Sequence, residues 1–162
     1  MADSIDNRQD IIYSRDVIER IEELQDERDA LDSEVEEART ERDEEAGREE
    51  PDGEKIAELS EIIGEREQSL LQWDKENGEE LRLLKSLQED AEGYSGWRHG
   101  AALIRDSYFE DHARELASDL HGRKIDNAEW PFNHIDWAAA ADELKQDYTS
   151  IDFDGVDYWV RS

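Results

Sequence analysis

The side chains able to perform acid–base or metal chemistry are four histidines and a large excess of carboxylates. The 162 residues include 47 Asp and Glu, four His and no Cys. His112 lies beside Asp111 and His134 lies close to Asp136, but no H-E-x-x-H sequence and no pair of histidines four residues apart is present. The lack of cysteine excludes disulfides, thiolate ligands and thiol nucleophiles. We therefore expect no metal site, and interpret the histidines as core or surface residues.

Neither the carboxylates nor the glycines indicate a catalytic site. Carboxylate pairs occur throughout so acidic a chain, so none of them marks general acid–base catalysis. Gly93, Gly96 and Gly100 lie close together, but their spacing is not that of a phosphate-binding loop. No G-x-S-x-G motif occurs. We expect a protein that is not an enzyme, with no catalytic residues and no cofactor.

The charge of the chain restricts what it can bind directly. Against the 47 acidic side chains stand 19 basic ones, a formal net charge of −28. Nucleic acids and anionic membranes bind basic surfaces and would repel this chain. No apolar run is long enough to span a bilayer, and the first residues lack the basic and apolar regions of a signal peptide. These features predict a cytoplasmic protein whose partner is another protein.

The charge is concentrated in the first part of the chain. Residues 1–92 carry 33 acidic and 12 basic side chains, a net of −21, and residues 93–162 carry a net of −7. Eleven of the 13 aromatic residues and all four histidines follow residue 92. This division predicts two domains, an acidic helical arm over 1–92 and a small compact domain over 93–162.

Two apolar heptad repeats predict that the arm is an antiparallel coiled-coil helical hairpin. One repeat starts at Val17 and the other at Ile56, and residues 47–53 between them contain both Gly and Pro. Ser14 and Asp16 are plausible N-caps of the first helix. Asn77-Gly78 lies inside the second repeat, where we expect a kink; a three-helix arrangement is the alternative. Polar residues in the predicted seam, Arg28, Arg42, Arg66 and Asn77, are expected to set the register, and a homodimer through the arm is possible.

The remaining residues predict a small α+β domain with two helices and a C-terminal β-hairpin. Helical spacing covers residues 101–120, and Asp136 is placed to cap a second helix from Trp137 to about Gln146. Asp154-Gly155 lies between alternating apolar and polar residues, the strongest short-range hairpin signal. Its predicted buried face consists of Ile151, Phe153, Val156, Tyr158 and Val160. The predicted fold class is therefore mainly α.

Three segments resemble small, mostly uncharacterised bacteriophage and prophage proteins. They are SRDVIERIEEL at 14–24, LIRDSYFEDHARELA at 103–117, and IDW at 135–137 with DYTSIDFDGV at 147–156 and YWVR at 158–161. The pieces YFED at 108–111 and IDW are also similar to antirestriction proteins of the Ard type. Members of that group are acidic DNA mimics that occupy the DNA groove of restriction–modification enzymes, so the resemblance implies an inhibitor without catalytic residues.

Acidity and resemblance together suggest a phage-encoded inhibitor of a host DNA-handling defence complex of the restriction or CRISPR type. Two helices side by side are about 20 Å across, and the arm would carry roughly one net negative charge per 2.5–3 Å of its axis. B-DNA carries one per about 1.7 Å. The arm would then bind the basic DNA-binding surface of that complex in the cytoplasm of the bacterial host.

The predicted partner-binding residues are the carboxylates outside the seam and two aromatic side chains of the compact domain. These are Glu19, Glu22, Glu23, Asp26, Asp29, Glu36, Glu49, Glu50, Glu58, Glu61 and Glu65 with Trp130 and Trp159. One alternative function is a non-enzymatic coiled-coil adaptor or dimerisation protein whose C-terminal domain binds a protein. Adaptation to high salt is another, consistent with 14 Arg against 5 Lys, and would spread acid over every surface.

Overall fold

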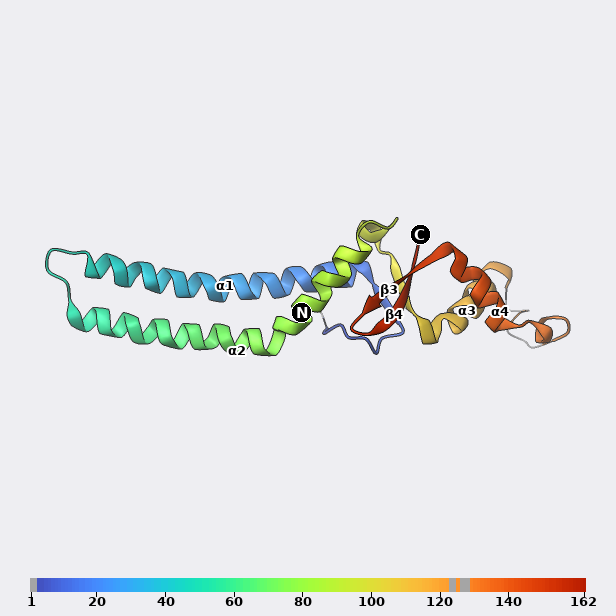
Figure 1. The fold of residues 1–162 in the computed structure, drawn as a ribbon, viewed down its shortest axis with the longest axis horizontal. Helices are drawn as coiled ribbons and strands as arrows, with labels where there is room; N and C mark the ends of the chain where they lie inside the picture. The colour runs from blue at the N-terminus through green and yellow to red at the C-terminus, as the bar shows by residue number, and fades with distance from the viewer. Residues whose placement is uncertain (1–2, 123–124, 126–128) are drawn as a thin grey trace.

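The chain forms a long helix pair that projects from a compact end (Figure 1). The computed structural model describes residues 3–122, 125 and 129–162. The two long helices are α1, Ser14–Ala46, and α2, Gly53–Ala91. Together with a small antiparallel sheet, they make the protein mainly helical, as predicted. The connecting loop contains Pro51, and the Asp52 side chain caps α2 by accepting from the amides of Glu54 and Lys55.

The two long helices run antiparallel along the arm, and cross-helix pairs fix their register. Arg28 of α1 contacts Asp74 of α2, and farther toward the loop Arg39 contacts Glu67. Most apolar heptad positions are buried between the helices, or between the helices and the compact end. On α1 these are Val17, Ile21, Leu24, Val35 and Ala38, and on α2 they are Leu59, Ile63, Trp73, Leu84, Leu87 and Ala91. The interlocking of side chains that distinguishes a coiled coil stays a prediction.

The second helix continues without interruption through Asn77 and Gly78. The Asn77 side-chain amide donates to the Trp73 carbonyl oxygen one turn earlier, at 3.3 Å. Figure 1 shows the axis of α2 changing direction between the arm and the compact end, so the helix is bent but not broken. The three-helix alternative is therefore not the structure of the arm.

A four-stranded antiparallel sheet forms the centre of the compact end. Its strands are β1 (Ile11–Tyr13), β2 (Ala102–Arg105), β3 (Tyr148–Phe153) and β4 (Val156–Arg161), in the order β1-β2-β4-β3. The Asp154-Gly155 hairpin is confirmed, with the positive φ of 50° and 76° at these two residues that its two-residue turn needs. All five residues of the predicted hairpin face belong to one apolar cluster.

The predicted helix over 101–120 is wrong in its first third. Residues 102–105 form β2, a short 3-10 turn covers Asp106–Tyr108, and α3 spans Phe109–His121. Leu103 and Ile104 are neighbours and both are buried, on opposite faces of the sheet. Burial of consecutive residues on two sides is possible in a central strand. The second predicted helix is present as α4, Trp137–Leu144, and its Asp136 cap accepts from the Ala139 amide at 3.1 Å.

The start of α1 also differs from the prediction. Its N-cap is Tyr13, which makes no side-chain cap hydrogen bond, and neither Ser14 nor Asp16 acts as the cap. Ser14 is fully buried, and its hydroxyl donates to the Trp97 carbonyl oxygen at 2.6 Å. The strand β1 runs directly into the helix, so the position of the first helical residue is fixed by the sheet and by Trp97.

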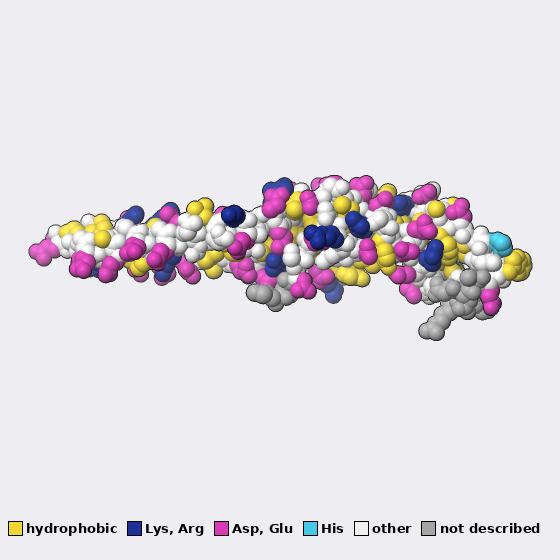
Figure 2. All heavy atoms as spheres, turned by 90° about the horizontal axis from the view of Figure 1, so that it is seen from below, with side chains coloured by type: hydrophobic (Ala, Val, Ile, Leu, Met, Phe, Trp, Pro, Cys, Tyr) yellow, Lys and Arg dark blue, Asp and Glu magenta, His cyan; other side chains and the backbone are white. Residues whose placement is uncertain are grey.

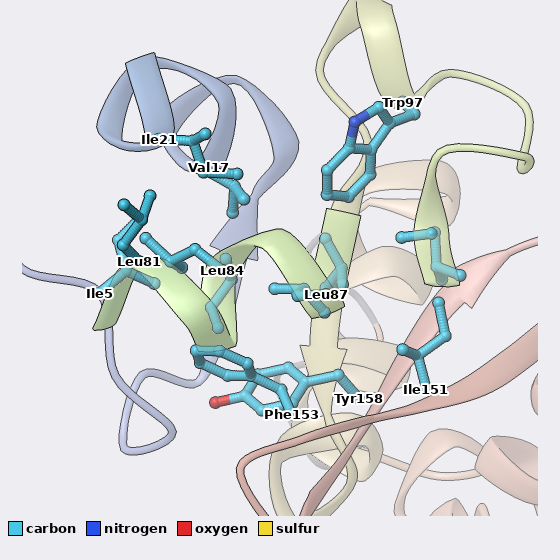
Figure 3. Close-up of a cluster of buried hydrophobic side chains, with 14 of the residues drawn as sticks. Ile5, Val17, Ile21, Leu81, Leu84, Leu87, Trp97, Ile151, Phe153 and Tyr158 are labelled. Atoms are coloured by element: carbon cyan, nitrogen blue, oxygen red, sulfur yellow. The ribbon is translucent and has the colours of Figure 1, made fainter. Parts of the chain in front are cut away.

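The larger apolar core includes residues on both sides of the predicted boundary at residue 92. On one face of the sheet, Leu81, Leu84 and Leu87 of α2 pack over Phe153 and Tyr158 (Figure 3). Val17 and Ile21 of α1, Ile5 and Trp97 also belong to this cluster. The opposite face of the sheet carries a second cluster in which Ile104 packs with Phe109 and Ala113 of α3 and Ala141 of α4. The base of the arm is thus built into the compact end.

Candidate functional site: the acidic helical arm

Four predicted carboxylates form one stripe along α1. Glu19, Glu22, Asp26 and Asp29 follow one another at intervals of three or four residues, which places them on one face of the helix. That face is opposite the buried residues Val17, Ile21 and Leu24, and all four carboxylates are exposed. None of the four forms an ion pair within the described part of the chain. The stripe extends over eleven residues, 19–29, about 15 Å of helix.

A second stripe lies on α2, nearer the loop. Glu58, Glu61 and Glu65 are exposed on the side of α2 opposite its buried residues. Glu49 and Glu50 are also exposed, in the loop between the helices. No ion pair involves these five carboxylates among the residues that the structure describes. Because each stripe faces away from the other helix, the arm presents unpaired negative charge on both of its outer edges.

The two remaining predicted carboxylates are held in ion pairs with arginines one turn away. Glu23 lies 2.9 Å from a guanidinium nitrogen of Arg20, and Glu36 lies 2.6 Å from Arg39. Both are less available to a partner than the residues of the stripes, since binding would first have to replace an existing pair. The structure therefore divides the predicted set into nine unpaired carboxylates and two paired ones.

Several basic side chains of the arm join its two helices. Arg28 Nε lies 2.9 Å from Asp74 Oδ1, and Arg39 spans from Glu36 to Glu67 of the other helix at 2.6 Å. Arg66 donates to the backbone carbonyl oxygen of Glu34 at 2.7 Å. Of the four polar seam residues predicted to set the register, Arg28 and Arg66 contact the other helix. Arg42 instead pairs with Asp43, and Asn77 bonds within α2. The cross-helix contacts leave the outer stripes uncompensated, because the arginines that make them lie between the helices.

An ion pair at the base of the arm was not predicted from the sequence. Arg20 of α1 and Glu80 of α2 approach to 3.0 Å, and their side chains are only 11% and 16% exposed. Glu80 also accepts from the backbone amide of Ile5 at 3.1 Å. Burial tends to raise the pKa of Glu80, but the hydrogen bonds from Arg20 and Ile5 outweigh it and hold the pKa below its ordinary value. In the heptad pattern Glu80 is a polar residue at an apolar position, so the sequence alone does not indicate its partner.

The two predicted aromatic anchors lie in different environments. Trp130 is 79% exposed in a turn beyond α3, where its side chain is available to a partner. Trp159 is part of the packing between the sheet and α3: its indole N–H donates to Asp106 Oδ1 at 2.7 Å. The Lys145 ammonium lies 4.9 Å from the Trp159 ring centre and 2.8 Å from Asp106. The hydrogen bonds from Lys145 and Trp159 lower the pKa of Asp106.

The histidines do not form a common site. His112 is partly buried against Phe109, with its Nε2 atom 3.4 Å from the Tyr148 hydroxyl, and burial lowers its pKa. His99, His121 and His134 are exposed. In the described part of the chain, no three His, Asp or Glu residues are arranged to hold a metal ion. Nor does any described helix combine the length and apolar character needed to cross a membrane.

The surface of the arm is acidic, with neutral and basic side chains between the carboxylates. Figure 2 shows Asp and Glu side chains at the loop end and along the visible face of the arm, with Lys and Arg between them. Such a surface can accept charge-assisted hydrogen bonds from the Arg and Lys of another protein. Comparison with protein-family models, with curated proteins and with solved structures gave no match.

Proposed function

We propose that the protein is a non-enzymatic inhibitor that inserts its acidic arm into the DNA-binding surface of a DNA-handling protein complex. The observation that carries this proposal is the pair of exposed carboxylate stripes. Glu19, Glu22, Asp26 and Asp29 on α1, and Glu58, Glu61 and Glu65 on α2, form no ion pair within the described chain. A folded protein gains no stability from such an arrangement, since like charges one turn apart repel.

The dimensions of the arm suit a groove that accommodates duplex DNA. Two packed helices are about 20 Å across. The α1 stripe offers one carboxylate about every 5 Å of axis, on the same scale as the phosphates along a DNA strand, one per 3.4 Å. Packing of α1 and α2 as a coiled coil would make the arm stiff enough to keep this spacing on binding, so that little ordering entropy is lost.

The proposed partner is a host defence complex of the restriction or CRISPR type, in the cytoplasm of a bacterium that carries the phage. Support for this choice comes from the resemblance of residues 14–24 and 103–117 to phage proteins, and of shorter segments to acidic antirestriction proteins. Arg and Lys side chains of the partner would pair with the stripes. A homodimer formed through the arm is compatible with inhibition only if it leaves the outer edges accessible.

The proposal is tested by reversing the α1 stripe. A variant with Glu19, Glu22, Asp26 and Asp29 all replaced by Lys should lose the ability to displace labelled duplex from purified restriction and CRISPR complexes. The matched control replaces Asp119, Asp142, Glu143 and Asp157 by Lys, which changes the net charge equally at exposed positions in the compact end. Circular dichroism establishes that both variants keep their helix content.

The displacement measurements distinguish mimicry of DNA from the alternatives. Displacement by the wild type that is lost only in the stripe variant supports mimicry, as does steep weakening between 0.1 and 0.5 M salt. Equal loss in both variants would mean that only the total charge matters. Failure of the wild type to displace duplex from any complex in the panel would refute the proposal.

A second candidate function is an adaptor that binds a protein through its compact end. The exposure of Trp130 favours it, because large exposed aromatic side chains are enriched at the centres of protein interfaces. The arm would then act as a spacer. Trp130→Ala discriminates between the two functions: it should abolish partner binding by an adaptor and leave displacement of duplex by the arm unchanged.

A further inference from the structure

A small hollow in the compact end is lined by apolar, neutral polar and basic residues, although the chain as a whole is acidic. It lies on the sheet face that packs against α3 and has a volume of about 260 Å³. Its apolar lining is formed by Ala101, Ala102 and Ile104, from strand β2 and the residue before it. Four polar side chains complete the lining: Ser95, His112, Tyr148 and Arg161. None of the described residues that line it is acidic, in a chain that has 47 acidic residues.

The sheet brings the polar side chains to one place. Tyr148 of β3 and Arg161 of β4 are direct cross-strand partners, so their side chains project from the same face of the sheet. His112 reaches this face from α3, with Nε2 at 3.4 Å from the Tyr148 hydroxyl. Ser95 belongs to the loop that follows α2. Hydroxyl, imidazole and guanidinium groups from four separate segments therefore surround one small apolar surface.

Arg161 has no carboxylate partner within the described chain, unlike most of its arginines. Two carboxylates, Glu115 and Asp147, act electrostatically on residues of the hollow without lining it. Glu115 acts on His112 electrostatically but accepts a hydrogen bond from Tyr108 at 2.7 Å, and Asp147 acts on Tyr148 from outside the lining. An unpaired guanidinium beside hydroxyl donors is a typical recognition site for a carboxylate, to which Arg binds with two parallel hydrogen bonds.

We propose that this hollow binds a small organic carboxylate with an apolar body. Arg161 pairs with the carboxylate, the hydroxyls of Tyr148 and Ser95 donate to it, and the apolar body lies on Ala102 and Ile104. The volume is slightly below that of common ligand pockets, which fits a molecule of about ten non-hydrogen atoms. A single guanidinium beside a neutral imidazole matches one negative charge better than the two of a phosphate.

This site is independent of the proposed function of the arm. It lies on the face of the sheet opposite the cluster that contains Leu84 and Leu87 of α2, and none of its lining residues belongs to either carboxylate stripe. Loss of duplex displacement by the arm would leave the hollow unchanged, and loss of carboxylate binding would leave the stripes unchanged.

The test uses benzoate as the probe and the full-length protein, with amide chemical shifts in NMR spectra as the measurement. We expect saturable shifts at Ala101, Ala102 and Tyr148, with a dissociation constant on the order of 1 mM or tighter for a ligand of this size. Benzamide has the same shape without the charge and should bind at least tenfold more weakly. Inorganic phosphate should also bind at least tenfold more weakly, because it has no apolar body.

Two variants identify the charged partner. Arg161→Gln should weaken benzoate binding at least tenfold, and Arg161→Lys should restore part of it, since the charge returns without the two-pronged geometry. The control is Arg98→Gln, an exposed arginine outside the hollow, which should bind benzoate as the wild type does. Unchanged amide spectra away from residue 161 show that the variants are folded.

Several outcomes would overturn the proposal. Equal affinity for benzamide and benzoate would show that the site does not recognise charge, and equal affinity for phosphate would show a general anion site. Shifts confined to residues outside the hollow, unchanged binding by Arg161→Gln in a folded protein, or no saturable shift up to about 10 mM benzoate would each mean that the assigned residues do not bind a carboxylate.

Discussion

Arg28 Nε and Asp74 Oδ1 lie 2.9 Å apart across the middle of the arm, although both side chains are about 40% exposed. The hydrogen bond to Asp74 raises the pKa of Arg28, so the arginine is charged at any working pH. Farther along the same two helices, Arg20 and Glu80 form a second ion pair that is less exposed to solvent, with side chains 11% and 16% exposed. The two pairs differ in burial and in their further partners, because Arg20 also pairs with Glu23 and Glu80 also accepts from the Ile5 amide.

The exposed pair, Arg28 with Asp74, is expected to contribute little to the free energy of unfolding. Asp74→Asn should lower the free energy of unfolding by less than about 1 kcal/mol, because water and salt screen the charges and two long side chains lose entropy. A double-mutant cycle with Arg28→Gln, measured by urea unfolding, gives the coupling energy. The coupling should fall toward zero in 1 M NaCl; a salt-independent coupling would contradict this assignment.

The buried pair, Arg20 with Glu80, is expected to contribute more to the free energy of unfolding. Glu80→Gln leaves the Arg20 guanidinium facing an amide group that can accept fewer hydrogen bonds than a carboxylate, and weakens the bond from the Ile5 amide. We expect a loss of about 2 kcal/mol or more in unfolding free energy. Glu79→Gln, at the exposed neighbouring position, is the control and should leave the unfolding free energy nearly unchanged.

The same pair makes stability depend on pH in a definite direction. The folded-state pKa of Glu80 is lower than the ordinary value of 4.5, so folding favours its ionised form. Its contribution should be fully present above about pH 5.5 and be lost as the pH falls below 4.5 through the folded-state pKa. The measured quantity is the difference in unfolding free energy between wild type and Glu80→Gln at pH 3 to 7. A difference that grows on acidification would show the opposite linkage.

Ser14 is predicted to stabilise the junction of strand and helix. Its hydroxyl is buried and donates to the Trp97 carbonyl oxygen at 2.6 Å, so Ser14→Ala leaves a buried acceptor without that donor. We expect a loss of about 1–3 kcal/mol in thermal or chemical unfolding. Ser33→Ala, at an exposed position of the same helix, should change stability by less than about 0.5 kcal/mol.

The α1 stripe is predicted to destabilise the free protein. Glu19, Glu22, Asp26 and Asp29 form three consecutive like-charge pairs, each of which costs about 0.2–0.5 kcal/mol on a helix. Replacing all four by their amides should therefore raise the unfolding free energy by about 1 kcal/mol at low salt, with little gain in 1 M NaCl. A lower stability in the neutralised variant would mean that the stripe has a structural role.

Several local features could be predicted because their causes are local in the sequence. Asp154-Gly155 needs only two residues with positive φ, and the Asp136 cap needs only an amide three residues away. Exposure of the carboxylate stripes follows from the helical period, since residues between two buried seam positions must face outward. The pairing of Glu36 with Arg39, at i and i+3, also follows from this period, although we did not predict it.

The features that the sequence did not predict depend on distant parts of the chain. β1 has three residues and β2 has four, and each is stabilised by strands that are far away in sequence. Without knowledge of those neighbours, Leu103 and Ile104 fit the helical spacing that continues into α3. The ion pair of Glu80 could likewise not be predicted, because it depends on Arg20 and Ile5, which are distant in sequence. The hollow around Arg161 is assembled from five segments and leaves no local signal in the sequence.

The pairing of β1 with β2 has a consequence for how the chain folds. Tyr13 and Ala102 are aligned across neighbouring strands, yet residues 14–101 separate them. Closing so long a flexible loop is entropically costly and slow. Once α1 and α2 have paired, starting from the loop that connects them, the helix ends next to Tyr13 and Ala102 lie side by side. The two residues are then close in space without the closure of a long flexible loop. The acidic arm then acts as an internal template that aligns the strands of the sheet, so weakening the arm should delay formation of the compact end.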